Sequence, residues 1–403
     1  MGDKDYVTRV HSTPSGVDAA AWDLLLQSQS NPSPFMQHAY LAALHESGCA
    51  SPASGWTPSF VTLEQSGVLA AACVVYLKNH SYGEYVFDWA WASAYQQHGV
   101  PYYPKAVVAI PFTPVPGTRL MARAPDARAA LIRSLLAWSE ESSVSSLHLL
   151  FAADDDTTAC AQAGLLLRHT VQFHWTNTLP GYANFDDFIK TLAQDKRKKI
   201  RQERRKVADA GIAFRQREGT AITQGDWDFF YRCYERTYLE HGNPPYLNRD
   251  FFERMARTMP ENWVMFIAER NGRPVASSLI AAYAYSTGAS ATNGNISPRV
   301  AYGRYWGALE HVDCLHFEAC YYQPLQWCIE QGYQRFEGGA QGEHKMARAL
   351  LPVKTTSAHW LAHPAFADAV ARFLDRESDG IGNYLGDLAQ RSPFKKGLEP
   401  DPV

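Results

Sequence analysis

The amino-acid sequence predicts a mixed α/β protein in which two similar units are joined by one long basic helix. Three observations lead to this prediction. The chain has 403 residues, of which 46% are hydrophobic and 13% aromatic, enough for two ordinary domains with large cores. The expected order of strands and helices is similar in the two halves, although no sequence repeat accompanies it. Between the halves, residues 184–211 have the pattern of a single amphipathic helix.

The segment 184–211 has helix signals at both ends. Asn184 suits the N-cap, and Gly211 suits the position just past the last turn. Its first half carries an apolar stripe at helical spacing. Its second half is strongly basic, with charges at Lys196, Arg197, Lys198, Lys199, Arg201, Arg204, Arg205 and Lys206. This surface is either an ordinary solvated face or a contact for phosphate groups, including those of tRNA.

Composition narrows the class of protein. The net charge is only −3, so the basic helix is a local feature, which favours a local anionic partner over general coating of nucleic acid. Seven cysteines without CxxC spacing indicate a reduced protein. The sequence shows no secretion signal and no apolar stretch of membrane-spanning length. We therefore expect a cytoplasmic protein without a membrane span.

Residues 1–183 are expected to form the first unit. Helices are predicted at 17–27, 33–47, 126–141 and 155–163, and strands at 56–63, 68–77, 106–111, 147–151 and 165–178. The aromatic-rich stretch 82–105 is either core beneath a long loop or the wall of a substrate cleft. The turn at 112–120, with Gly117 and Arg119, is either a phosphate cradle or an ordinary connection. Lys105 and Arg119 are candidate ligands for an anionic group.

Residues 212–380 are expected to form the second unit, followed by a loosely ordered tail at 381–403. Helices are predicted at 223–239, 249–259, 319–332 and 364–378, and strands at 212–217, 263–269, 274–286, 289–293, 315–318, 335–338 and 353–360. Asn271-Gly272 is the strongest hairpin signal in the chain. His241, Asn243 and Tyr246 lie in a proline-rich turn that could cover a cleft, although the rigidity of the turn alone would explain its composition.

Three stretches and the basic segment carry a resemblance to a known family. The stretches are YYPKAVVAIPFTPVPGTRL, HGNPPYLNRDFF and HFEACYYQPLQWCIEQGYQRFEGGAQGEHKMARALLPVKTTSAHW, and the basic segment is KRKKIRQERRKVADAGI. Together they resemble the FemAB-like branch of the GNAT acyltransferase superfamily, described as peptidoglycan biosynthesis/recognition proteins or N-acyltransferases. The similarity covers about residues 10–375, with GAQGEHK its most specific part. Ala349-Leu350 departs from the expected glycine followed by an aromatic residue.

The resemblance implies tandem GNAT-like domains, each a mixed, mostly antiparallel sheet flanked by helices, and amide-forming acyl transfer. In GNAT enzymes the donor is usually acyl-CoA, whose pyrophosphate contacts backbone N–H groups. Fem-type members instead take an aminoacyl group from aminoacyl-tRNA and transfer it to a cell-wall precursor amine. The acceptor here is expected to be a small-molecule or cell-wall-precursor amine. The alternatives are a Fem-like tRNA-dependent transferase and a non-catalytic module that binds a cell-wall fragment or RNA.

Amide formation needs a base for the amine and a donor for the leaving group. Glu337 and His344 are the candidate bases, and Tyr321 is the candidate acid. Glu337 could instead form a structural ion pair with Lys345, and Tyr321 could belong to the core. Substrate-binding candidates are Gln341, Lys345, Arg348, His241, Asn243, Tyr246, Lys105 and Arg119. Gly338, Gly339 and Gly342 would allow close approach of the cofactor to the backbone.

No metal site is expected. His344, His359 and His363 with Glu343 could be assembled into one, but the chain has no HExxH motif there.

Overall fold

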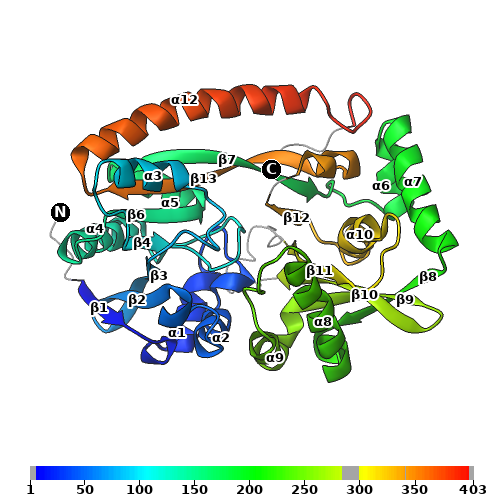
Figure 1. The fold of residues 1–403 in the computed structure, drawn as a ribbon, viewed down its shortest axis with the longest axis horizontal. Coiled ribbons are helices and arrows are strands. Elements are labelled where there is room, and N and C mark those ends of the chain that lie inside the picture. Colours follow the sequence, from blue (N-terminus) through cyan, green and yellow to red (C-terminus); the bar gives the residue numbers. More distant parts are fainter. Residues whose placement is uncertain (1–5, 284–298, 341, 399–403) are drawn as a thin grey trace. The chain divides into compact units, whose positions relative to one another are not determined.

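The computed structural model describes residues 6–283, 299–340 and 342–398 (Figure 1). The chain forms two compact units, each built from two separate segments. The first unit comprises Met1–Thr170 and Lys354–Tyr384, and the second comprises Val171–Val353 and Leu385–Val403. A division by sequence order alone, such as the expected 1–183 and 212–380, does not describe this arrangement. Both units are mixed α/β, as the sequence predicts.

The sheet of the first unit has the strand order β1-β2-β3-β4-β6-β13, with the short β5 paired to β3. All pairs are antiparallel except β4 and β6. The strands are β1 Val7–His11, β2 Trp56–Gln65, β3 Val68–Lys78, β4 Lys105–Val108, β5 Met121–Ala122, β6 Ser146–Ala152 and β13 Leu351–Leu361. The helices are α1 Ala19–Gln27, α2 His38–Glu46, α3 Trp89–Gln97, α4 Pro125–Glu141, α5 Asp154–Gln162 and α12 Pro364–Ala389, whose last residues belong to the second unit.

The sheet of the second unit has the order β8-β9-β10-β11-β12-β7, again with one parallel pair, β11 and β12. The strands are β7 Leu166–Thr176, β8 Ile212–Glu218, β9 Trp263–Arg270, β10 Arg273–Tyr283, β11 Val300–Ala308 and β12 Arg335–Ala340. The helices are α6 Phe185–Thr191, α7 Gln194–Asp209, α8 Gln224–Glu240, α9 Arg249–Thr258, α10 Leu315–Phe317 and α11 Gln323–Glu330.

The two strand sets have the same internal order: four antiparallel strands, then a parallel neighbour, then a last antiparallel strand. The last strand of each set comes from the other half of the sequence. Residues of β7, which follows β6 in the chain, complete the second sheet, and residues of β13, which follows β12, complete the first. This exchange explains why each unit is discontinuous.

The predicted long helix is wrong at its centre. Asn184 caps α6 as expected, by accepting from the N–H of Asp187. The helix ends at Thr191, however, because Leu192 is extended and buried. The backbone of residues 191–193 pairs instead with residues 393–395, through Ala193 N–H to Pro393 O at 2.8 Å and Lys395 N–H to Thr191 O at 2.9 Å. These bonds compete with helix continuation, so α7 starts afresh at Gln194.

Three further expectations need correction. Residues 315–318 are helical and not a strand, and α12 continues to Ala389, so the expected loose tail is helical up to that residue. Strand β11 was not predicted, and neither was α3. The strand expected at 289–293 lies outside the described residues. The hairpin at Asn271-Gly272 is confirmed, with φ near +52° and +72° at its two turn residues.

Glycine is required where α8 crosses the second sheet. A Cβ atom on Gly307 of β11 would lie 1.9 Å from the carbonyl oxygen of Cys233 in α8. The helix packs directly on the strand backbone, with its capping box at Thr223 and Asp226 fixing where it starts.

Candidate active site

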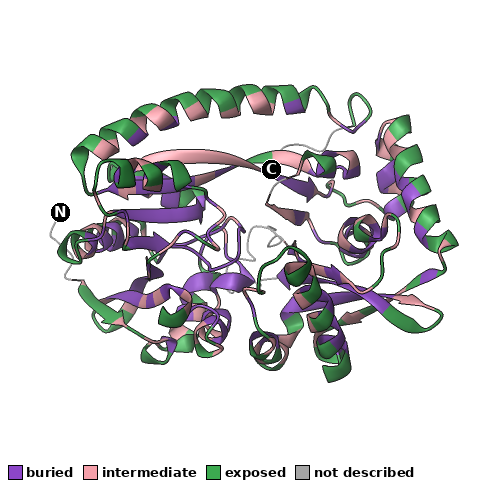
Figure 2. Cartoon of the chain, in the orientation of Figure 1, coloured by how far each residue is buried: buried purple, intermediate pink, exposed green. Residues whose placement is uncertain are grey.

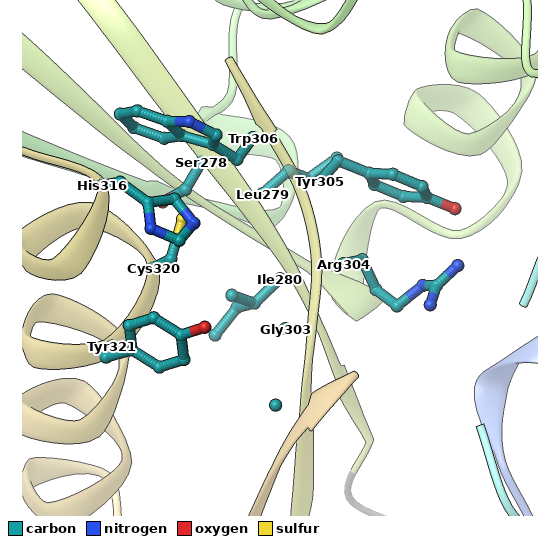
Figure 3. A pocket seen from close by; sticks show the side chains of 11 residues that line it. Ser278, Leu279, Ile280, Gly303, Arg304, Tyr305, Trp306, His316, Cys320 and Tyr321 are labelled. Atoms are coloured by element: carbon teal, nitrogen blue, oxygen red, sulfur yellow. The ribbon is translucent and has the colours of Figure 1, made fainter. Parts of the chain in front are cut away.

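The second unit contains a pocket where its two parallel strands separate. Strands β11 and β12 pair from Val300 opposite Arg335 to Tyr302 opposite Glu337, and the pairing ends there. A pocket of about 120 Å³ lies beside this point (Figure 3). Gly303 and Gly338 line it from the two strands. A Cβ atom on Gly303 would lie 2.9 Å from Phe336 Cζ, and one on Gly338 would lie 2.5 Å from Leu350 Cδ2, so the packing itself requires glycine at both positions.

The opposite wall comes from a helix with a widened turn. Glu318–Tyr322 form a π-helical turn between α10 and α11. Pro324 has no N–H to donate to the carbonyl of Cys320, which favours the wider turn. His316, Cys320 and Tyr321 line the pocket from this helix (Figure 3). The turn therefore sets which side chains reach the pocket.

Tyr321 and His344, two of the predicted catalytic residues, lie together. The Tyr321 hydroxyl is 3.3 Å from Nε2 of His344. Burial raises the pKa of Tyr321, so its hydroxyl stays protonated at neutral pH. Burial, with the charges of Lys345, Arg348 and Lys199, lowers the pKa of His344 below its usual 6.5, so the imidazole is neutral. The pair combines a neutral base with a hydroxyl donor at the pocket wall.

Lys345 lies beneath the glycine-rich turn that follows β12. Its ammonium donates to the carbonyls of Gly339 at 3.0 Å and Ala340 at 3.2 Å, and only 3% of the residue is exposed. Burial lowers its pKa to about 8. Gly339 and Gly342 have φ of +77° and +110°, conformations that favour glycine. Gln341 lies outside the described residues.

Arg348 is held by a buried carboxylate from the basic helix. Its Nη2 lies 2.9 and 2.8 Å from the two carboxylate oxygens of Glu203 in α7. The Tyr322 hydroxyl also donates to Glu203, and the guanidinium stacks 3.6 Å from the Phe317 ring centre. Nη1 donates to the carbonyl of His344 at 2.8 Å. Arg348 is 2% exposed, so it fixes the segment around His344 and is not an open anion ligand.

Glu337 occupies a different environment from Tyr321 and His344. It is 2% exposed and does not line the pocket. Arg335 Nε lies 3.0 Å from its Oε1, and His174 Nε2 lies 4.0 Å from its Oε2. Burial, with Arg335 and Lys345, lowers the pKa of His174 to about 3, so that ring is neutral. The ion pair between Glu337 and Lys345, which the sequence left open as an alternative, is not what these contacts show: Glu337 faces Arg335 and His174.

Three further predicted residues, His241, Asn243 and Tyr246, make local contacts in the turn after α8. His241 and Asn243 are exposed in the turn after α8, where His241 Nδ1 lies 2.6 Å from the Thr237 carbonyl and Asn243 donates to the His241 carbonyl at 3.0 Å. The Tyr246 ring contacts that of Tyr238 at 5.7 Å. These contacts close the helix end.

In the first unit, both candidate anion ligands are buried. Arg119 donates to the carbonyls of Leu150, Gly117, Thr118 and Val115. Lys105 pairs with Glu84 at 2.8 Å and with Asp88. Neither presents an open cation, and Arg119 holds the turn that was a candidate phosphate cradle.

The basic helix keeps part of its charge in solvent. Ile200, Glu203 and Val207 are buried, and the outer face of α7 is exposed (Figure 2). Arg204 pairs with the buried Glu318 at 3.0 Å. Four exposed cations have no hydrogen bond or ion pair to any described residue: Lys198, Lys199, Arg201 and Arg205.

Several residues of this region were not identified from the sequence. They are His174 beside Glu337, Glu203 beside Arg348, and His316 and Trp306 in the pocket wall. For Glu203 a signal existed, because one glutamate lies among eight basic residues between 196 and 206. A lone glutamate on the apolar stripe of a basic helix indicates a buried ion pair.

Comparison with known proteins identifies the family. Residues 13–396 match the FemAB-like family model, described as peptidoglycan biosynthesis/recognition, and the chain belongs to this family. Among solved structures, FemX aligns with a TM-score of 0.52 at 9% identity, covering 88% of this chain and 98% of that one.

Two further structures are similar in fold. The C-terminal domain of a putative lysylphosphatidylglycerol synthetase from Agrobacterium fabrum gives a TM-score of 0.53 at 10% identity, covering 89% and 96% of the two chains. The L-PGS of Bacillus licheniformis gives 0.51 at 12% identity, covering 89% and 97%. No curated protein sequence matches the chain.

The described residues contain neither a membrane-spanning helix nor a metal site. Over that part of the chain, no helix has the length and apolar character needed to cross a membrane. In the same ranges, no three His, Cys, Asp or Glu side chains are grouped so that they could hold a metal ion.

Proposed function

We propose that this protein is a transferase that forms an amide bond on an amine acceptor, with acyl-CoA as donor. The observation that carries the proposal is Tyr321, which lines a pocket between separating parallel strands and whose hydroxyl lies 3.3 Å from Nε2 of His344. Membership of the FemAB-like family supports it. The acceptor is a small-molecule amine or the amine of a cell-wall precursor.

The reaction would proceed by direct attack of the amine on the acyl carbonyl. A C–N bond forms and the C–S bond to the donor thiol breaks. The proton on the attacking nitrogen passes to the neutral imidazole of His344, and the Tyr321 hydroxyl donates a proton to the departing thiolate. The hydrogen bond between the two side chains lets His344 return that proton to Tyr321. Each group then ends in its starting state.

Two side chains remain candidates for the base. Neither side chain lines the pocket itself, but His344 is favoured because it hydrogen-bonds to Tyr321 of the pocket wall, whereas Glu337 is ion-paired with Arg335. If His344 is the base, kcat/KM should fall only on the acid side of the usual histidine pKa, because burial and the neighbouring cations lower the pKa of this imidazole, and it is protonated only there. Glu337→Gln should leave this acid limb in place, and His344→Gln should remove it together with most of the rate.

A second candidate is a Fem-like transferase that takes its acyl group from aminoacyl-tRNA. The exposed cations Lys198, Lys199, Arg201 and Arg205 favour it, and Lys199 is close enough to influence the pKa of His344. The peptidoglycan description of the family points to a cell-wall precursor as acceptor in that case. A third candidate is a binding module that recognises a cell-wall fragment or RNA without turnover.

Calorimetric titration with acetyl-CoA, at low and moderate salt, separates the three candidates. Micromolar binding with a mild salt dependence supports the acyl-CoA transferase. No heat with acetyl-CoA, combined with tRNA affinity that falls steeply with salt, supports the tRNA-dependent enzyme. Replacing Lys199, Arg201 and Arg205 with Gln should then lower the salt slope by about 0.7–0.9 for each phosphate that is no longer neutralised. If the parent protein shows no turnover, and Tyr321→Phe and His344→Gln bind the ligand as tightly as the parent does, only the binding module remains.

A further inference from the structure

Helix α3 of the first unit carries aromatic residues on both of its faces. Trp91 and Tyr95 are buried in a core cluster with residues of β13 and α12. Trp89, Ala92, Ser93 and Gln96 recur at i, i+3, i+4 and i+7 and line a groove of about 680 Å³ on another face. Residues 99–103 form the facing wall. The core does not require an aromatic residue at position 89, so its exposed indole needs another explanation.

The aromatic surface of this groove is held in place. Trp89 is 44% exposed and Tyr82 is 60% exposed, with their rings 5.5 Å apart at 60°. In the facing wall, the Tyr102 hydroxyl donates to Asp88 at 2.6 Å, and the Tyr103 hydroxyl lies 2.9 Å from that of Ser81. Tyr102 is only 4% exposed, so a ligand would meet the rings of Trp89 and Tyr103, whose orientation is already fixed.

Buried charges anchor this wall from behind. Lys105, which is fully buried, bonds to Ser81 at 2.8 Å and pairs with Glu84 and Asp88. The same hydroxyl of Tyr102 also lies 3.2 Å from Nε2 of His148. The buried ion pairs of Lys105 thus position Tyr102 and Tyr103, through Asp88 and Ser81; such charges are costly to bury unless they are paired.

The chemistry of the lining selects the ligand. The nine described residues that line the groove carry aromatic faces, one carboxamide and one serine hydroxyl, and none is charged. This lining offers nothing to neutralise a phosphate or carboxylate. Pyranose rings have one apolar face that stacks on indole or phenol rings and hydroxyl or acetamido groups at the edge that bond to Gln96 and Ser93. We propose that this groove binds an uncharged oligosaccharide, independently of the reaction in the second unit.

The test is titration of the full chain with chitotetraose, an uncharged chain of N-acetylhexosamine rings. Saturable binding is expected, weakened about tenfold by Trp89→Ala and less by Gln96→Ala. Phe87→Ala is the matched control, because Phe87 is 52% exposed, close in sequence and outside the groove lining. The affinity of Phe87→Ala for chitotetraose should equal that of the parent protein. A hyaluronan tetrasaccharide, which carries carboxylates, should bind more weakly.

Three results would overturn the assignment. The first is no saturation with chitotetraose up to about 10 mM, a concentration above which even weak specific binding would be saturated. The second is an affinity that Trp89→Ala and Phe87→Ala change equally, or equal affinity for the charged tetrasaccharide. The third is self-association, measured by sedimentation, that Trp89→Ala abolishes, because the groove would then be covered by a second copy of the chain. Thermal unfolding of Trp89→Ala and Phe87→Ala, followed by circular dichroism, separates lost binding from lost folding, because a variant still folded at the temperature of the titration can lose affinity only through the groove.

Discussion

Replacing Glu203 with alanine removes the carboxylate that neutralises Arg348. The two residues are 8% and 2% exposed, so the guanidinium would be left buried with its main counter-charge gone. Breaking a buried ion pair from one side typically costs about 3–5 kcal/mol, mainly through the uncompensated charge. The hydrogen bond from Tyr322, which disappears as well, adds to this cost. For a unit of about 200 residues, the size of the second unit, the melting temperature changes by about 2–4 °C per kcal/mol, so the transition of this unit should fall by roughly 10 °C.

The assay is thermal unfolding followed by circular dichroism, with Gln202→Ala as the control. Gln202 is the exposed neighbour of Glu203 on the same helix, and its replacement should change the melting temperature little. The double variant Glu203→Leu/Arg348→Met removes both charges and should be more stable than Glu203→Ala alone. A loss below about 1 kcal/mol for Glu203→Ala, or a double variant less stable than either single change, would refute the reasoning.

Two further predictions concern packing and pH. Gly307→Ala should destabilise the protein by more than about 4 kcal/mol, because its Cβ would lie 1.9 Å from the Cys233 carbonyl oxygen. Gly272→Ala, with φ of +72° and nothing within 4 Å of its Cβ, should cost only about 1–2 kcal/mol. Urea unfolding measures both losses of stability, and equal losses would contradict the packing argument. The pKa of His174 is about 3 in the fold and about 6.5 when unfolded, so its contribution to stability is complete above pH 6.5 and is lost, at up to about 1.4 kcal/mol per pH unit, as the pH falls toward 3. His174→Phe should therefore lose less stability than the parent protein between pH 7 and pH 5 in urea unfolding, and identical pH profiles would show that the ring is not buried neutral.

The structure also explains one departure from the family pattern. Ala349, where the resemblance led us to expect glycine, has φ of +63°, in the left-handed region that glycine adopts most easily. Arg348 immediately before it is fixed by Glu203, and Leu350 after it is fully buried against Gly338. The surrounding contacts therefore hold an alanine in a conformation that it disfavours by about 1–2 kcal/mol.

The sequence by itself determined the fold class, the family and most individual elements. Local signals were sufficient where the cause is local: Asn184 caps a helix, Asn271-Gly272 makes a hairpin turn, and alternating or periodic apolar residues mark strands and helices. The sequence also indicated both Tyr321 and His344 as catalytic candidates, and both lie in the stretch 316–360, one of those that carry the resemblance to the family.

Only the tertiary structure decided which candidates act together. The break at Leu192 depends on backbone bonds to residues about 200 positions later, and β7 and β13 each pair with a strand far away in the sequence, β12 and β6. Arg348 and Arg119 look like free anion ligands in sequence, but buried partners distant along the chain engage both. Burial and pairing are properties of three-dimensional neighbours, so the roles of charged residues followed from the fold, while turns and caps followed from the sequence.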